Sequence, residues 1–177
     1  AMASIAAAWA INIPWETICK GLSTFISDIQ GVPGRFNVFE YKGATVIADY
    51  GHNPDAIKAL VQAVTNLPAQ KRSVVISGAG DRRDDDIREQ TRIIGDAFDE
   101  VVLYQDACQR GRVDGEVLKL LRQGLEGAKR TRQVDEIYGE FLAIDDRFSS
   151  RKTNTILISE TTDRYLYSRS EVSDMIG

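Results

Sequence analysis

The apolar positions of this chain follow two different spacings in alternation. Short apolar runs predict strands, and the segments between them, with apolar residues every three or four positions, predict amphipathic helices. The expected strands cover residues 36–41, 44–48, 73–77, 100–104, 131–134 and 155–159. The expected helices between them cover about 54–66, 84–98 and 114–125, and a further helix carries Ile137, Phe141, Ile144 and Phe148 on one face.

Strands that alternate with helices imply βαβ units. We therefore expect an α/β, Rossmann-like fold, with a mostly parallel sheet and helices on both faces. The first two strands meet at Lys42-Gly43, which is a hairpin signal. This N-terminal hairpin would add an antiparallel edge strand to the sheet.

The start of the chain has a different pattern. Residues 3–27 predict two helices broken near Pro14, and the first is apolar nearly all round, as a helix inside a larger body is. Residues 28–35 contain glycine and proline and predict a linker. We expect a helical remnant of a preceding domain over residues 1–30 and one domain over residues 31–177. The apolar first helix could also drive homo-oligomer formation.

Composition and charge limit the partners. The hydrophobic content of 43% and charged content of 27% are typical of a globular protein. The net charge of -4 argues against general nucleic-acid or membrane-surface binding, because both need a basic patch. Cys19 and Cys108 form neither a disulfide framework nor a metal-ligand spacing. We therefore expect a cytoplasmic protein with reduced thiols and no metal site of its own.

Three polar loops follow expected strands. They cover residues 49–53, 78–83 and 106–112. In open α/β sheets, ligands bind beyond the carboxyl ends of the strands. These loops are therefore the candidate sites.

In the first loop, Asp49 stands at a strand end and can accept a hydrogen bond from a ribose hydroxyl. His52 can bond a nucleotide or hold a neighbouring loop. Asn53 suits an N-cap and Pro54 the first helical position, and the N–H groups of that helix favour an anion such as phosphate. The alternative is a simple capping network around Pro54, and spacing does not decide between the two. A lone histidine excludes a His-rich metal site.

The second loop reads Gly78-Ala79-Gly80-Asp81-Arg82-Arg83. It matches neither the dinucleotide fingerprint nor a P-loop. Its glycines permit close approach of the backbone, and Arg82 or Arg83 could clamp a phosphate or carboxylate. Alternatively, the arginines pair with the aspartates that open the following helix.

The third loop places Arg110 and Arg112 on either side of a glycine. Guanidinium groups suit carboxylate and phosphate recognition. The alternative is a solvated loop. A catalytic Cys108 is disfavoured, because no second histidine exists to activate it.

Taken together, these loops resemble the C-terminal domain of the Mur ligases. The segments concerned are Val32-Pro33-Gly34-Arg35-Phe36-Asn37, Asp49-Tyr50-Gly51-His52-Asn53-Pro54 and Gly80-Asp81-Arg82-Arg83-Asp84. The continuation Asp85-Asp86-Ile87-Arg88, and Arg110-Gly111-Arg112 with Gly115-Glu116, are most similar to the cyanophycin synthetases within that superfamily. The resemblance covers roughly residues 3–135. The family usually has alanine where this chain has Gly51.

The resemblance implies an ATP-dependent amide ligase, in which a carboxylate becomes an acyl phosphate and an amine then attacks it. In cyanophycin synthetases this ligase half adds arginine to aspartate side chains of a polymer. The implied ATP-binding residues are Arg35, Asp49, His52 and Asn53. The implied catalytic residues, at the reaction centre or the growing polymer, are Arg82 and Arg83. Arg110, with Arg112 beside it, would hold the carboxylate of the incoming amino acid.

The resemblance also implies a missing partner. The P-loop lysine and magnesium ligands of a Mur ligase belong to a central ATPase domain, and residues 3–27 are expected to be its last two helices. We therefore expect ATP as cofactor, magnesium held mainly by that domain, and no ligase activity of the isolated chain. The alternatives are another Mur-type peptide ligase, or a non-catalytic nucleotide-binding or interaction module.

Overall fold

The computed structural model describes residues 2–26, 31–32, 34–41, 43–140, 142–143 and 155–160, with residues 41 and 155–160 described by their backbone alone. The helices are α1 (Met2–Ala10), α2 (Trp15–Ser23), α3 (Pro54–Thr65), α4 (Asp84–Gly95) and α5 (Glu116–Gly124). The strands are β1 (Asn37–Tyr41), β2 (Ala44–Asp49), β3 (Lys71–Ile76), β4 (Glu100–Gln105), β5 (Gln133–Tyr138) and β6 (Thr155–Glu160). None of the helices in these ranges is long and apolar enough to cross a membrane.

The strands form one sheet in the order β1-β2-β6-β3-β4-β5. β1 runs antiparallel to β2, and every other neighbouring pair is parallel. β6 lies between β2 and β3, so that Ile158 pairs with Ile47 on one side and with Val74 on the other. The mostly parallel sheet with an antiparallel edge strand is confirmed.

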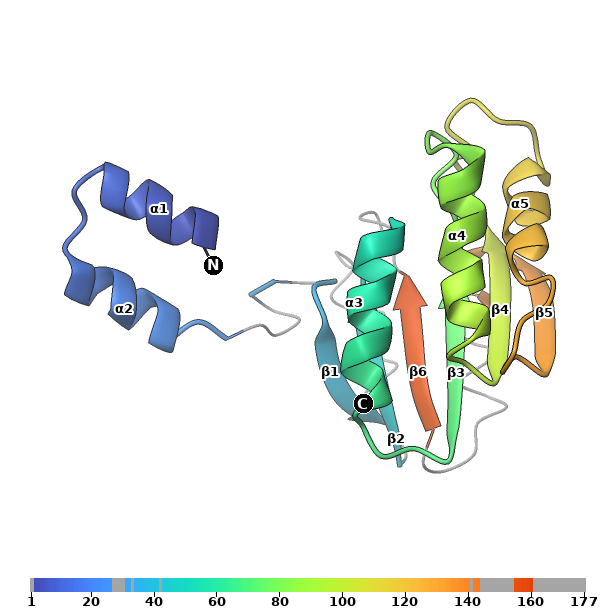
Figure 1. Ribbon diagram of the computed structural model, residues 1–177, viewed down its shortest axis with the longest axis horizontal. Coiled ribbons are helices and arrows are strands. Elements are labelled where there is room, and N and C mark those ends of the chain that lie inside the picture. The colour runs from blue at the N-terminus through green and yellow to red at the C-terminus, as the bar shows by residue number, and fades with distance from the viewer. Residues whose placement is uncertain are drawn as a thin grey trace.

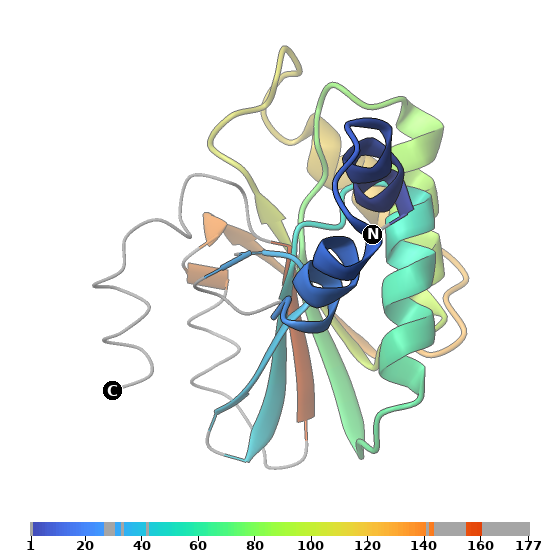
Figure 2. The same ribbon diagram turned by 90° about the vertical axis from the view of Figure 1, so that its left-hand side faces the viewer.

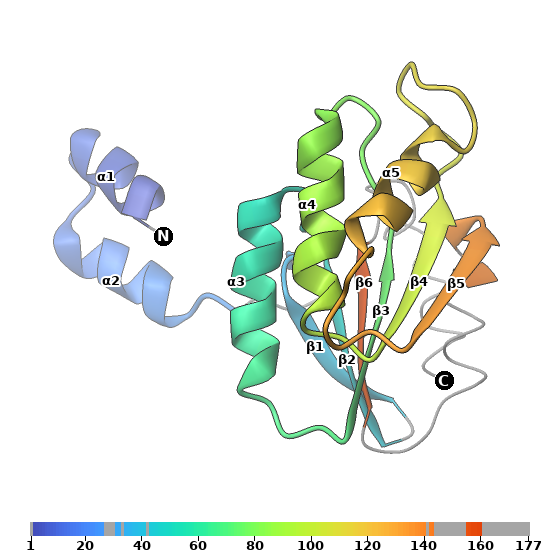
Figure 3. The ribbon, with the colours of Figure 1, turned by 45° about the vertical axis from the view of Figure 1, so that its right-hand side comes forward.

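Alternating residues of the strands build a core on each face of the sheet. In β3, Val74 and Ile76 point toward α3, α4 and α5, while Val75 points to the opposite face. Figure 3 shows these three helices side by side on one face, and Figure 2 shows α3 and α4 on the same side of the sheet. On the other face, helical Ala143 is fully buried against Tyr104 and its neighbours. Helices on both faces are therefore confirmed.

α4 and α5 pack closely, which brings the loops before them together. A Cβ added at Gly124 would lie 2.1 Å from the Arg88 carbonyl oxygen, so only glycine permits this approach. The Thr91 hydroxyl donates to the Leu121 carbonyl oxygen at 2.7 Å, and Arg88 Nε donates to Gln123 at 2.9 Å. The N-terminal ends of α4 and α5, which follow β3 and β4, are consequently held side by side (Figure 3).

α1 and α2 form a pair set apart from the sheet (Figure 1). α1 has no buried residue, and Ile18 is the buried residue of α2. An apolar groove of about 420 Å³ lies between the two helices. The exposed large apolar side chains of this region are Met2, Trp9, Ile11, Trp15, Leu22, Phe25 and Ile26. Assignment of this pair to a preceding domain stays a prediction.

The helix that was expected to include Ile137 is wrong at its start. Ile137 lies in β5, opposite Tyr104 of β4, and packs against the second core cluster. Pairing with β4 extends β5 to Tyr138, and Gly139, with φ of 100°, follows the strand. The expected strand at 131–134 is therefore observed at 133–138, because pairing with a distant strand overrides a short local pattern. Phe141, Ile144 and Phe148, and the stretch after residue 160, lie outside the described residues.

Candidate functional site

The end of β2 anchors the segment that carries Arg35. Asp49 Oδ2 accepts a hydrogen bond from the Phe36 N–H at 2.8 Å. The next residue, Tyr50, donates its own N–H to the Gly34 carbonyl oxygen at 2.9 Å. Arg35 lies between these two attachments, so its backbone is fixed at the carboxyl end of β2.

His52 is oriented by a backbone group. Its Nδ1 lies 2.9 Å from the Tyr50 carbonyl oxygen. Because a carbonyl oxygen only accepts, Nδ1 donates this hydrogen bond, and Nε2 is the ring nitrogen left for another group. The imidazole is therefore fixed in one tautomer.

Asn53 caps α3 as the sequence predicted. Its Oδ1 accepts from the Ala56 N–H at 2.9 Å, and Pro54 occupies the first helical position. The capping interpretation is thus confirmed for Asn53. A role toward a nucleotide stays a prediction and would act through the helix N-terminus that this residue holds.

Tyr50 contacts two of the predicted site residues, Arg35 and His52. The Arg35 guanidinium carbon lies 5.2 Å from the centroid of the Tyr50 ring. The His52 and Tyr50 ring centroids are 4.7 Å apart, with the rings tilted by 49°. Arg110, in the third loop, lies 3.4 Å from Asp81 in the second loop. Thus Tyr50 joins the segment ahead of β1 to the first loop, and the pair of Arg110 and Asp81 joins the third loop to the second.

The Tyr50 contact and the Asp81 charge raise the pKa of Arg110, against the opposing effect of partial burial. Arg110 is therefore a persistent cation. The backbone of Arg110 has φ of 48°, in the left-handed region that residues other than glycine rarely adopt. Gly111 follows with φ of 92°. The loop is thus sharply bent where it presents this guanidinium.

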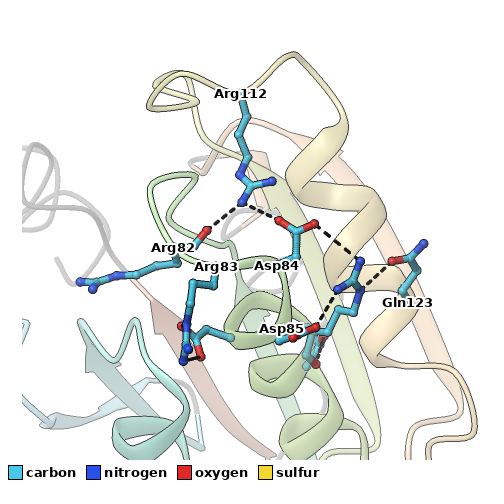
Figure 4. A network of polar contacts seen from close by, with 9 residues as sticks. Arg82, Arg83, Asp84, Asp85, Arg112 and Gln123 are labelled. Atoms are coloured by element: carbon cyan, nitrogen blue, oxygen red, sulfur yellow. Dashed lines mark hydrogen bonds and ion pairs between the residues drawn. The ribbon is translucent and has the colours of Figure 1, made fainter.

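Arg112 joins the second loop to the third (Figure 4). Its Nε and Nη2 donate to the Gly80 and Arg82 carbonyl oxygens, each at 2.7 Å. Nη2 also lies 2.8 Å from Asp84, and Nη1 donates to Glu116 at 2.6 Å. The hydrogen bond with Asp84 and then that with Glu116 raise the pKa of Arg112. The guanidinium is therefore already engaged by four acceptors, and its predicted substrate contact stays a prediction.

Gly80 lets the same two loops touch. A Cβ at this position would lie 2.1 Å from the Gln109 carbonyl oxygen. No side chain fits there without moving one backbone or the other. This glycine therefore serves loop–loop contact, a role that the sequence could suggest but not locate.

Arg82 and Arg83 take different positions. Arg83 forms a bidentate pair with Asp86, at 2.9 and 2.8 Å, and is 84% exposed. That hydrogen bond lowers the pKa of Asp86. The alternative in which an arginine pairs with the helix-opening aspartates is thus observed for Arg83. The Arg82 side chain is exposed and points away from Arg112, and only its carbonyl enters the network (Figure 4).

The structure thus gathers some predicted site residues and separates others. Arg35 and His52 share Tyr50. Arg110 and Arg112 both contact the second loop, whereas Arg83 pairs within its own helix. The sequence analysis gave Tyr50 no role. Its position directly after an aspartate at a strand end was the available signal.

A family profile described as "Mur ligase, glutamate ligase domain" matches residues 34–149. The chain belongs to this family. The match takes in β1 to β5 and all three loops. The predicted family membership is therefore confirmed.

Curated relatives of this Mur ligase domain include cyanophycin synthetases. The chain is 30% identical over 158 residues to that of Nostoc sp. (strain PCC 7120), covering 89% of this chain and 18% of the relative. It is 34% identical over 145 residues to that of Geminocystis herdmanii, covering 82% and 16%. The UDP-N-acetylmuramoyl-L-alanyl-D-glutamate–2,6-diaminopimelate ligase of Alkaliphilus metalliredigens is 32% identical over 148 residues, covering 83% and 27%. The chain therefore spans less than a third of each of these ligases.

Solved structures share the fold. A UDP-N-acetylmuramoyl-L-alanyl-D-glutamate–2,6-diaminopimelate ligase superposes with a TM-score of 0.63 at 21% identity, covering 90% of this chain and 32% of that one. E. coli FolC in complex with ADP gives 0.64 at 21% identity, covering 93% and 35%. These likenesses support the Mur ligase fold of the chain.

Proposed function

We propose that this chain forms the C-terminal side of an ATP-dependent acid–amino-acid ligase of the cyanophycin synthetase type. One observation carries the proposal. In a Mur ligase domain, arginine-bearing segments meet at the carboxyl ends of parallel strands, where Arg35 lies over Tyr50 and Arg112 joins the second loop to the third. Such guanidinium groups fit a reaction whose nucleotide, carboxylate and transferred phosphoryl group are all anions.

The nucleotide face would consist of Arg35, Asp49, His52 and Asn53. The hydrogen bond between the Phe36 N–H and Asp49 holds the backbone next to Arg35. From this position Arg35 would bind phosphate oxygens. Asp49 accepts this hydrogen bond with Oδ2, so Oδ1 would accept a hydrogen bond from a ribose hydroxyl. His52 offers Nε2 as a further acceptor, while Asn53 holds the N-terminus of α3.

The substrate face would centre on Arg110, which would hold the carboxylate of the incoming amino acid. Arg82 has an exposed guanidinium and would act at the reaction centre or the growing polymer, with Arg83 beside it. Arg112 would support this face by fixing the loop that carries Arg110. When ATP is bound it supplies the phosphoryl group that activates the acceptor carboxylate. The arginines then stabilise the negative charge that develops during transfer.

The remainder of the site would come from a central domain. In this proposal that domain holds the phosphates and magnesium, and α1 and α2 are its last helices. Arginine would be the incoming amino acid and an aspartate side chain of a polymer the acceptor, in the cytoplasm. The isolated chain would have no ligase activity, and ATP-dependent amide formation by it would refute this part of the proposal.

Calorimetric titration with ATP tests the nucleotide face. Asp49→Asn keeps an oxygen for the Phe36 N–H but removes the charge, so the loop should stay in place. Because hydrogen bonds to charged groups contribute about 1.5–3 kcal/mol, we expect affinity to fall at least about tenfold. Glu126→Gln is the control, since this carboxylate is exposed and follows the C-terminus of α5. Equal affinity of the wild type and Asp49→Asn would place the nucleotide elsewhere.

A second candidate is a Mur-type ligase that takes another amino acid. The 32% identity to a 2,6-diaminopimelate ligase favours it. Titration with L-arginine and with 2,6-diaminopimelate distinguishes the two. Tighter binding of the second ligand would replace the cyanophycin-type assignment.

A further inference from the structure

The turn that carries Arg35 contains a residue in a strained backbone conformation. Phe36 has φ of 51°, in the left-handed region that is rare for a bulky side chain. Its side chain packs against the apolar core beneath α3, α4 and α5, whereas Arg35 beside it is exposed. Strain of this kind persists only where the surrounding contacts hold it, and it concentrates at binding and catalytic sites. The contacts that hold Phe36 therefore indicate what this turn is built to present.

Asn37 closes the turn from inside the protein. It is the first residue of β1 and is only 2% exposed. Its Oδ1 accepts a hydrogen bond from the Gly34 N–H at 2.7 Å, and its Nδ2 donates to the Val32 carbonyl oxygen at 3.1 Å. Both bonds reach back over Arg35 and Phe36. The buried amide therefore ties the residues before Arg35 to the strand that follows it.

Contacts from the end of β2 fix the same turn relative to the sheet. Asp49 accepts from the Phe36 N–H at 2.8 Å, and the Tyr50 N–H donates to the Gly34 carbonyl oxygen at 2.9 Å. Arg35 lies between the two residues held in this way. The Arg35 guanidinium carbon is 5.2 Å from the centroid of the Tyr50 ring. This guanidinium is thus presented from a backbone that is hydrogen-bonded on both sides.

We infer that Asn37 is a positioning residue, which holds the strained turn so that Arg35 faces the phosphates of ATP without further ordering. The benefit is entropic, because a backbone that is already ordered loses less conformational freedom when a ligand binds. This inference rests on the proposed function for the role of Arg35 toward ATP. The turn and its hydrogen bonds are independent of that role.

A double-mutant cycle on ATP affinity provides the first test, with titrations followed by ¹H–¹⁵N NMR so that weak binding is also measured. Asn37→Ala removes both hydrogen bonds and should weaken ATP binding about three- to tenfold, because Arg35 must then be ordered on binding. In a chain that already carries Arg35→Ala, the same change should alter affinity by no more than about 1.5-fold. A purely structural role for Asn37 would instead lower the affinity equally in both backgrounds.

Two further variants keep this cycle interpretable. Val38→Ala is the matched control, since Val38 follows Asn37 in β1 and is 51% exposed, and it should leave ATP affinity unchanged. Asn37→Ser keeps a neutral polar side chain in the strand but is too short to replace both hydrogen bonds. It takes the place of Asn37→Ala in the cycle if circular dichroism shows that the alanine variant does not fold.

The Arg35 side chain provides a second test, which needs no ligand. Its Nε–H signal in a ¹H–¹⁵N NMR spectrum of the whole chain senses the nearby Tyr50 ring. Tyr50→Leu gives the position of that signal without the ring. Asn37→Ala should move the Arg35 signal toward this position, whereas Val38→Ala should leave it at its wild-type position.

Two results would overturn the inference. One is a change in ATP affinity on replacing Asn37 that is the same with and without Arg35, and the other is an Arg35 signal that Asn37→Ala leaves unchanged. If the wild-type chain does not bind ATP, the proposed function fails on its own account. The Arg35 signal would then decide alone whether Asn37 positions this guanidinium.

Discussion

Replacing Arg112 with alanine should destabilise the chain through the contact between its second and third loops. The side chain is 16% exposed and its guanidinium meets two backbone carbonyls and two carboxylates. Truncation leaves the carbonyl oxygens of Gly80 and Arg82 without this donor. Asp84 and Glu116 are 51% and 38% exposed, so water replaces much of what they lose.

The magnitude follows from these four contacts. Each hydrogen bond from a charged donor to a carbonyl contributes about 1–1.5 kcal/mol here, because the loop edge remains near water. Each half-exposed carboxylate adds at most about 0.5 kcal/mol. The free energy of unfolding should therefore fall by about 2–4 kcal/mol, and the melting temperature by about 4–16 °C for a chain of this size.

Urea denaturation followed by circular dichroism measures the loss. Arg112→Lys keeps the charge but not the fork of donors, so it should recover less than half of the stability. Arg92→Ala is the matched control, because Arg92 is 68% exposed and pairs with Glu89 one turn away on the same helix. Its effect should stay within about 0.5 kcal/mol. If Arg112→Ala and Arg92→Ala lose the same stability, Arg112 does not stabilise the contact between the second and third loops.

Two further predictions concern other positions. Gly80→Ala should cost about 1–3 kcal/mol by forcing its loop away from Gln109, whereas Gly21→Ala, with open space at its Cβ, should not destabilise α2. The same urea titration compares them, and equal midpoints would contradict the assigned close approach. Burial opposes ionisation of Asp99, but the Arg130 guanidinium and the Arg72 N–H outweigh burial and lower the pKa of this carboxyl. Because the pKa is lowered on folding, the stabilisation is present above the ordinary aspartate value of about 3.9 and is lost as pH falls below it. Asp99→Asn should thus be less stable than the wild type at pH 7 and lose less on acidification below about pH 4, and parallel pH curves would refute this assignment.

The candidate site divides between what a local pattern reveals and what it does not. Asp49, Arg110 and the capping by Asn53 could be located from residue type and position after a strand. The contact of Arg112 with the second loop could not be predicted, since a guanidinium group suits a ligand and a neighbouring loop equally well. Three of its four acceptors lie about 30 residues away and become its neighbours only because β3 and β4 are adjacent.

Most of the helices and strands, the hairpin and the three polar loops could be predicted from the sequence. These follow from side-chain periodicity, capping residues and glycines, which act within a few residues of one another. Three further features follow from the tertiary structure: β6 enters between β2 and β3, Ile137 belongs to a strand, and Arg112 joins the second loop to the third. Those outcomes depend on which distant backbones pair and which side chains then compete for the same partners. No local pattern encodes that choice, because the competing partners are brought together only by the completed sheet.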